Sequence, residues 1–152
     1  MTAVEASFED LQRWMSWATE MPTRDEMLWL LEDGEAVFDK DEAWEYFIFE
    51  ARSNEFVGMA GLNNSRTGPK AVEVSYWVRS DRSGRGYATS AARALVDAAL
   101  TMEEIKWVEI RMDAANLASA AIPPKLGFDF ARTEISEIRA RAHTGRQLVW
   151  QL

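Results

Sequence analysis

Residues 80–90, SDRSGRGYATS, place two glycines between a strand pattern and an alanine-rich helical pattern. Glycine lets a ligand approach the backbone closely, and the first N–H groups of a helix have no partner within it. Because the helix dipole adds partial positive charge there, Gly84 and Gly86 predict an anion site, usually for phosphate. The arginines that would strengthen such a site are Arg79, Arg82 and Arg85.

Two common phosphate-binding motifs do not fit this stretch. The dinucleotide fingerprint needs a third glycine at position 89, where the chain has Thr89. The P-loop needs a Gly-Lys-Ser/Thr run, which the sequence lacks. The alternative to a ligand site is therefore a plain turn at the entry of the helix.

The elements that would position this stretch form an α/β (α+β) pattern. Helices are predicted over 7–18, from the Thr23–Glu26 capping box to before residue 41, over 88–99 and, briefly, from Leu117. Strands are predicted over 44–51, 56–62, 71–78, 106–112, 128–139 and 146–152. We find no repeat or linker, so residues 1–152 are expected to form a single domain. Its sheet should be mixed, with one strand–helix–strand crossover around the glycines.

Composition and charge exclude several classes of site and partner. The chain of 152 residues has no Cys and one His, His143, which we interpret as a surface residue far from the motifs. No apolar run is long enough to span a bilayer, so a cytoplasmic location without a membrane partner is the expectation. The net charge of −8 argues against a nucleic-acid partner. Residues 63–95 nevertheless carry six bases and two acids, which favours a local anion site.

A resemblance to a known family becomes visible in two blocks. The stretch VSYWVRSDRSGRGYATSAARALVDAAL, with Ser83-Gly84-Arg85-Gly86-Tyr87-Ala88, resembles the acetyl-coenzyme A signature of the GNAT N-acetyltransferase superfamily. The second block, Asn116-x-x-Ser119 followed by Lys125-Leu126-Gly127-Phe128, is similar to the RimJ/RimL-type branch, named for acetyltransferases of ribosomal-protein N-termini. The resemblance implies a GNAT-like, mostly antiparallel sheet flanked by helices, with a central β-α-β cofactor-binding unit.

Three departures from the family pattern stand out. Ser83 replaces the usual Arg or Gln, and Pro123-Pro124 should make the second helix short or bent. The family also normally begins with a strand and part of a helix, about thirty residues that this chain lacks. We therefore expect a missing edge strand or a late start, and an exposed edge makes a homodimer reasonable.

The resemblance implies a role for each candidate residue. The pyrophosphate of acetyl-CoA would lie on the N–H groups of 84–88, and the strand end from Trp77 through Val78 to Arg79 would pair with the pantetheine arm. Glu73, which shares a strand face with Ser75, would take a proton from the amine; the alternative is a solvent-facing or ion-paired Glu. Asn116 and Ser119 would contact the pantetheine arm, and Ser119 would also donate a proton to the leaving thiolate. Lys125 would contact a phosphate, and Trp14 and Trp17 would lie beside the acceptor.

The predicted function is acetyl transfer from acetyl-CoA to a primary amine by direct attack in a ternary complex, without a metal. The acceptor could be a protein N-terminus, a polyamine or a cationic antibiotic. The first alternative is a non-catalytic acyl-CoA-binding or sensing module. The second is a nucleotide-binding regulator, against which the absent P-loop lysine argues.

Overall fold

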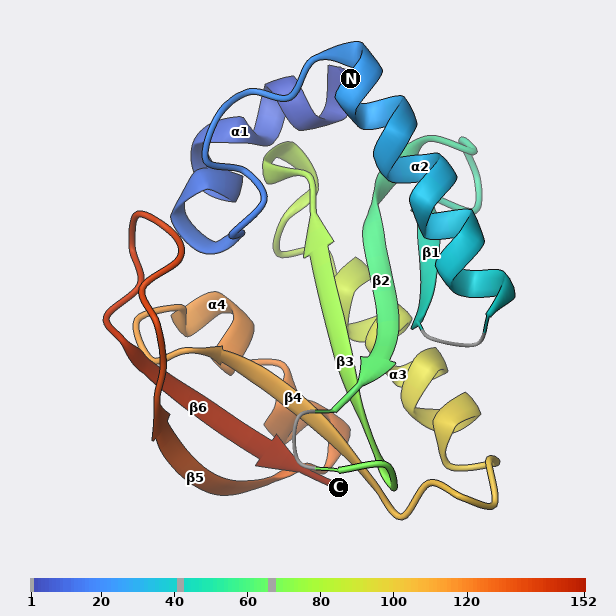
Figure 1. Cartoon of the computed structure of the whole chain (residues 1–152), viewed down its shortest axis with the longest axis vertical. Helices are drawn as coiled ribbons and strands as arrows, with labels where there is room; N and C mark the ends of the chain where they lie inside the picture. Colours follow the sequence, from blue (N-terminus) through green and yellow to red (C-terminus); the bar gives the residue numbers. More distant parts are fainter. Residues whose placement is uncertain (1, 41–42, 66–67) are drawn as a thin grey trace.

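The computed structural model describes residues 2–40, 43–65 and 68–152. Its strands form one sheet in the order β1-β2-β3-β4-β6-β5, in which only β3 and β4 are parallel neighbours (Figure 1). The strands are β1 (Ala43–Phe49), β2 (Phe56–Asn64), β3 (Ala71–Val78), β4 (Trp107–Asp113), β5 (Asp129–Ile135) and β6 (Arg146–Gln151). The helices are α1 (Thr2–Trp14), α2 (Arg24–Asp39), α3 (Tyr87–Ala99) and α4 (Leu117–Ala120), with 3-10 turns η1 (Ser80–Arg82) and η2 (Pro123–Leu126). The predicted element order and the mixed, mostly antiparallel sheet are confirmed.

Strands β3 and β4 pair over a short stretch and then diverge. The paired residues are Ala71 with Trp107, Val72 with Val108 and Glu73 with Glu109. Beyond this point β3 pairs with β2 alone and β4 with β6 alone, so the sheet opens into two halves (Figure 1). Parallel neighbours need a crossover, which α3 supplies, and this confirms the predicted unit around the glycines.

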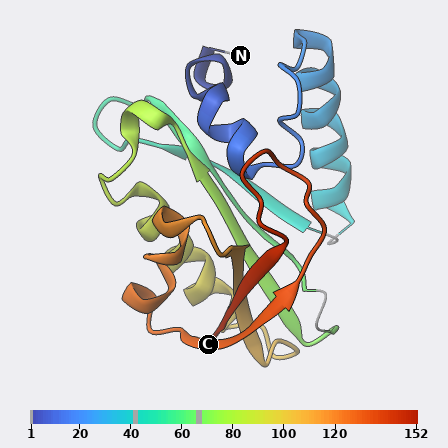
Figure 2. The same ribbon diagram turned by 90° about the vertical axis from the view of Figure 1, so that its left-hand side faces the viewer.

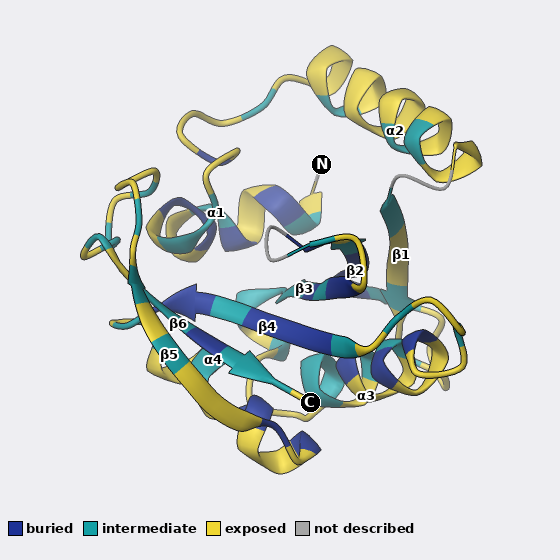
Figure 3. Cartoon of the chain, turned by 60° about the horizontal axis from the view of Figure 1, so that its bottom comes forward, coloured by how far each residue is buried: buried dark blue, intermediate teal, exposed yellow. Residues whose placement is uncertain are grey.

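The core lies between the sheet and α3. Val72 and Val74 alternate with polar residues along β3, and they pack against the fully buried Ala92 and Ala99 of α3. Alanine at these positions lets the helix lie close to the sheet, as predicted from its spacing. Figure 3 shows that β4 is buried along most of its length, while α2 is exposed.

The opposite face of the sheet is covered by α1 and α2, so that the sheet separates α2 from α3 (Figure 2). Val4 and Leu11 of α1 pack with Ala18 against Trp77, which points away from α3. The loop between β5 and β6 contacts the end of α1, since the Arg141 N–H donates to the Gln12 carbonyl at 3.1 Å. This face is therefore enclosed by helices and by that loop.

Two elements differ most from the prediction in their bounds. Helix α1 begins at Thr2, because Val4 lies two turns before Leu11 and is buried with it. Strand β5 ends at Ile135 rather than at residue 139, so residues 136–145 join it to β6. Helix α2 agrees with the prediction and continues through Gly34, since the predicted capping box at Thr23 forms and one glycine costs only about 1 kcal/mol. Proline does shorten the helix after Asn116, because α4 ends at Ala120 and η2 begins at Pro123.

Candidate functional site

The glycine stretch exposes a run of backbone donors at the start of α3. Gly84 and Gly86 have φ angles of 74° and 87°, a left-handed region that favours glycine, and Gly86 is the N-cap of α3. The first helical bond nearby joins the Ser90 N–H to the Gly86 carbonyl at 2.9 Å. Within the described chain, the N–H groups of residues 84–89 have no backbone or side-chain acceptor. Six successive free donors at a helix N-terminus have the arrangement of an anion-binding cradle, and anion binding there stays a prediction.

Carboxylates pair with two of the arginines that were expected to strengthen the anion site. Arg79 pairs with Glu55 at 2.7 Å and with Asp81 at 2.9 Å, and Arg82 pairs with Glu55 at 2.6 Å. The two carboxylates balance the two guanidinium charges, so this pair of arginines adds little net positive charge to the cradle. Arg85 is exposed on the loop itself.

Backbone N–H and C=O groups of β3 face the gap between β3 and β4. The Arg79 N–H donates to the Val57 carbonyl of β2 at 2.8 Å. Because successive residues of an antiparallel strand turn their backbone groups to opposite edges, those of Val78 and Tyr76 face the open edge. Val78 thus has the orientation that pairing with an added chain requires, whereas the backbone of Arg79 and Trp77 faces β2.

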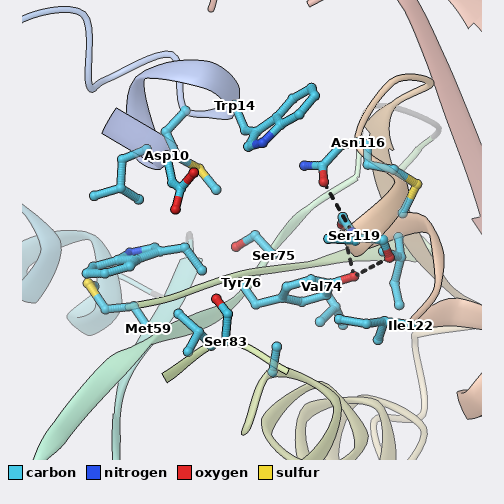
Figure 4. A pocket seen from close by; sticks show the side chains of 18 of the residues that line it. Asp10, Trp14, Met59, Val74, Ser75, Tyr76, Ser83, Asn116, Ser119 and Ile122 are labelled. Atoms are coloured by element: carbon cyan, nitrogen blue, oxygen red, sulfur yellow. Dashed lines mark hydrogen bonds between the residues drawn. The ribbon is translucent and has the colours of Figure 1, made fainter. Parts of the chain in front are cut away.

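The second block supplies a small polar cluster across this gap (Figure 4). The Asn116 side-chain Oδ1 accepts from the Ser119 N–H at 3.2 Å, so Asn116 is the N-cap of α4. The hydroxyls of Ser119 and Tyr76 lie 3.2 Å apart. Burial raises the pKa of Tyr76 to about 12, despite that hydrogen bond. The phenol is therefore protonated at neutral pH and can donate.

A cavity of about 1060 Å³ joins the cradle, the gap and the polar cluster. Most predicted site residues line it: Trp77, Val78, Ser83, Gly84, Gly86, Tyr87, Ala88, Asn116, Ser119 and Lys125. The structure does not place Glu73, Arg79 or Arg85 on its wall. The volume is of the size that holds a small-molecule ligand or cofactor.

Glu73 is instead engaged in an ionic network. Its carboxylate lies 3.7 Å from Arg111 Nε, and the Arg111 side chain is only 2% exposed. Arg111 also pairs with the fully buried Glu109 at 3.0 Å and with Glu134 at 2.6 Å. Glu73 lines a second cavity of about 430 Å³, which shares Trp14, Trp17, Asp113 and His143 with the first. The ion-paired alternative of the sequence analysis thus describes Glu73, and its role as a base stays a prediction.

The interpretation of His143 as a surface residue is wrong. The half-buried ring accepts the Arg139 N–H on Nδ1 at 3.4 Å, and its Nε2 lies 3.1 Å from the Trp14 carbonyl. Trp14 and Trp17 line both cavities, as the resemblance implied, and the Trp17 ring also contacts the Trp77 ring at 6.3 Å.

Several residues on the wall of the large cavity received no role from the sequence, and two of them, Tyr76 and Glu45, bear on the chemistry. Tyr76 lies within the first block but shares a strand face with valines, so its pattern indicates a core residue. Glu45 lies outside both blocks, between aromatic residues in the run WEYF, and its only signal is a charge within an otherwise apolar strand. The sequence did not reveal either role, because the neighbours of these residues in the site come from distant parts of the chain.

Comparisons with known proteins agree with this geometry. A sequence profile described as an acetyltransferase (GNAT) domain matches residues 2–129. YdaF of Bacillus subtilis, named a putative ribosomal N-acetyltransferase, is 32% identical over 71 residues. YkkB of the same organism, an uncharacterized protein, is 28% identical over 85 residues. The matches cover 47% and 55% of this chain but only 39% and 49% of those proteins, so the chain spans less than half the length of these curated relatives.

Solved structures with low sequence identity share the fold. RimL, a ribosomal L7/L12 alpha-N-protein acetyltransferase in complex with coenzyme A, has a TM-score of 0.88 at 18% identity. The microcin C7 self-immunity acetyltransferase MccE, in complex with acetyl-CoA and AMP, has a TM-score of 0.88 at 16% identity. Each alignment covers 99% of this chain and 84% or 83% of the other. In the described part of the chain, no helix is long and apolar enough to cross a membrane.

Proposed function

The chain belongs to the acetyltransferase (GNAT) domain family, and from this premise we propose that it transfers an acetyl group from acetyl-CoA to a primary amine. One observation carries the proposal: of residues 84–89, whose N–H groups are free, all but Arg85 line the same cavity as the residues of the gap between β3 and β4. A cradle of this kind fits a pyrophosphate, and a gap between strands fits an extended arm. We further propose that residues 1–152 act as one domain.

The residues of the cradle and gap would hold acetyl-CoA in a defined direction. The N–H groups from Gly84 to Ala88 would bind the pyrophosphate, with Ser83 and Lys125 at the rim of the same cavity. The open-edge backbone of Val78 would pair with the pantetheine arm. Its N–H would then stabilise the oxygen of the thioester as negative charge develops there.

The polar cluster would protonate the leaving thiolate. Ser119 lies within hydrogen-bond distance of the protonated Tyr76, and a hydroxyl supported by a second donor is a better acid than an isolated one. Asn116 would position Ser119 through its capping bond and contact the pantetheine arm. Proton removal from the amine needs a carboxylate on the α1 and α2 side, for which the sequence predicted Glu73.

The acceptor would enter from the side enclosed by α1 and the β5–β6 loop. The second cavity is lined by carboxylates and by the two tryptophans of α1 and its following turn, and it meets the large cavity there. An acidic lining attracts a cation. The solved neighbour from Salmonella typhimurium is described as modifying the N-terminal serine of a ribosomal protein. We therefore propose a protein N-terminus or a small cationic amine as the acceptor.

A thermal shift followed by an amine screen tests the proposal. Acetyl-CoA at a hundredfold excess over its dissociation constant should add about 2.7 kcal/mol to the free energy of unfolding, while ATP and NAD should add little. Release of free thiol in the presence of an amine would then show transfer. Binding with no transfer to any amine would indicate an acyl-CoA-sensing module instead, and no binding by the folded protein would refute the proposal.

A further inference from the structure

A carboxylate outside every recognised motif lies on the wall of the large cavity. Glu45, Gly61 and Ser75 are direct neighbours across β1, β2 and β3, so they project from the same face of the sheet. A Cβ atom added to Gly61 would overlap the carboxylate of Glu45. The missing side chain at Gly61 thus gives the Glu45 carboxylate room to lie across β2 toward β3.

Polar neighbours hold this carboxylate in place. Asn63 Nδ2 donates to Ser75 Oγ at 3.0 Å and lies 3.4 Å from Glu45 Oε1. Because Ser75 Oγ accepts from the amide, its own hydrogen is available to the carboxylate. Desolvation of the carboxylate raises the pKa of Glu45, against the lowering effect of Asn63 and Ser75, while the residue as a whole remains exposed to solvent.

Among the residues that the structure describes, no positive charge balances Glu45. None of the ion pairs among the described residues includes it. Strand β2 carries no charged residue, and α2 presents apolar Met27, Leu30 and Leu31 to the cavity. The other titratable residues lining the cavity are Asp10, Tyr76, Arg82, Tyr87, Arg111, Asp113, Lys125 and His143. Arg82 and Arg111 have their own carboxylate partners, Glu55 for the first and Glu73, Glu109 and Glu134 for the second.

Glu45 and Glu73 therefore differ in how well they can accept a proton from the acceptor amine. Glu73 is held by a buried guanidinium and lines only the smaller cavity. Glu45 faces the cavity that contains the glycine cradle, on the face of β3 that carries Ser75 and Trp77. A carboxylate without a cation partner, beside an amine-binding space, is suited to accept a proton.

We infer that Glu45 binds the ammonium group of the acceptor and takes its first proton, directly or through Ser75. This inference rests on the proposed function and names a catalytic residue for it. With that proton on Glu45, the neutral nitrogen forms the C–N bond while the C–S bond breaks. The second proton leaves the nitrogen through solvent and replaces the one that Ser119 gives to the thiolate, so that amide and free thiol form with Ser119 restored, and Glu45 returns its own proton to solvent.

The test compares Glu45→Gln with Glu32→Gln, which removes an exposed carboxylate from α2. Acetyl-CoA is supplied with a serine-initiated peptide and with spermidine, and kcat/KM is measured from pH 6 to 9. Glu45→Gln should lower kcat/KM at pH 7 about 100-fold or more, with acetyl-CoA affinity unchanged. Its residual rate should rise about tenfold per pH unit below the pKa of the acceptor amine, which is about 8 for the peptide, as free amine accumulates, whereas the wild-type profile levels off at lower pH. Glu32→Gln should match the wild type.

A second variant reaches the same carboxylate without removing its charge. Gly61→Ala should push Glu45 aside and lower kcat/KM at least tenfold while acetyl-CoA still binds.

If the wild type acetylates a probe and Glu45→Gln matches Glu32→Gln, this inference alone is overturned. The same holds if the activity of Glu45→Gln falls by the same factor at every pH. If Glu73→Gln, folded, shows the pH profile expected of Glu45→Gln, the base is Glu73. If the wild type binds acetyl-CoA but acetylates neither probe, the proposed function fails, and this inference with it.

Discussion

The substitution Gly86→Ala separates the two things that the glycine stretch does, which are to turn the chain and to bind an anion. Gly86 has a φ of 87°, and a Cβ atom placed on it would have no heavy atom within 4 Å. The cost to the fold is therefore conformational rather than steric. A left-handed backbone costs a residue with a Cβ about 1–2 kcal/mol. For a chain of this length, that lowers Tm by roughly 2 to 8 °C.

The effect on binding is larger than the effect on folding. The new methyl group would stand where the proposed pyrophosphate meets the N–H groups of the cradle. Losing one hydrogen bond to a charged group costs about 1.5–3 kcal/mol, so the dissociation constant for acetyl-CoA should rise about 10- to 100-fold. Calorimetric titration measures this constant, and thermal unfolding of the free protein measures the folding cost.

Two other glycines provide matched controls. Gly127→Ala meets the same φ of 87° away from the cavity, so it should lower Tm similarly and leave acetyl-CoA binding intact. Gly34→Ala lies inside α2 with nothing within 4 Å and no positive φ, so it should stabilise the fold by about 0.5–1 kcal/mol. Unchanged binding in Gly86→Ala would refute the cradle, and a Tm equal to that of Gly34→Ala would refute the strained backbone.

Three further predictions concern the polar cluster and the ionic network. Tyr76→Phe should lower the transfer rate more than acetyl-CoA affinity, because Ser119 loses its partner. Because the pKa of Tyr76 is raised to about 12, the folded state keeps a proton that the unfolded state releases above pH 10. The free energy of unfolding of the wild type should therefore fall by about 1.4 kcal/mol per pH unit from pH 10 to 12. Tyr76→Phe should not show this slope. Arg111→Met should lower the free energy of unfolding in urea by about 3–5 kcal/mol, because Glu109 and its neighbours lose the Arg111 cation. This loss should be smaller at pH 5 than at pH 8. Asn116→Ala should cost about 0.5–2 kcal/mol through the lost cap, and a loss of acetyl-CoA affinity beyond that of other α4 variants would support the pantetheine contact.

Much of the fold was predictable because its signals are local. Alternation along residues 71–78 predicted β3 with its actual bounds, and the Thr23–Glu26 pair predicted the start of α2. The glycine stretch predicted a crossover and an anion site, since a strand, two glycines and a helix must meet in that order. The ends of α1 and β5 were not predictable, because contacts with distant residues decide them.

The sequence by itself determined the family resemblance, the α/β order of elements and the glycine stretch that we propose as the phosphate-binding site. These depend on spacing within one strand, one turn or one helix, which the order of residues encodes directly. Only the tertiary structure decided how charges are shared. It paired Arg79 with Glu55, held Glu73 against Arg111, and left Glu45 facing the cavity without a cation partner among the described residues. The physical reason is that the chemistry of a carboxylate depends on what lies within a few ångströms of it, and those neighbours come from strands that only folding brings together.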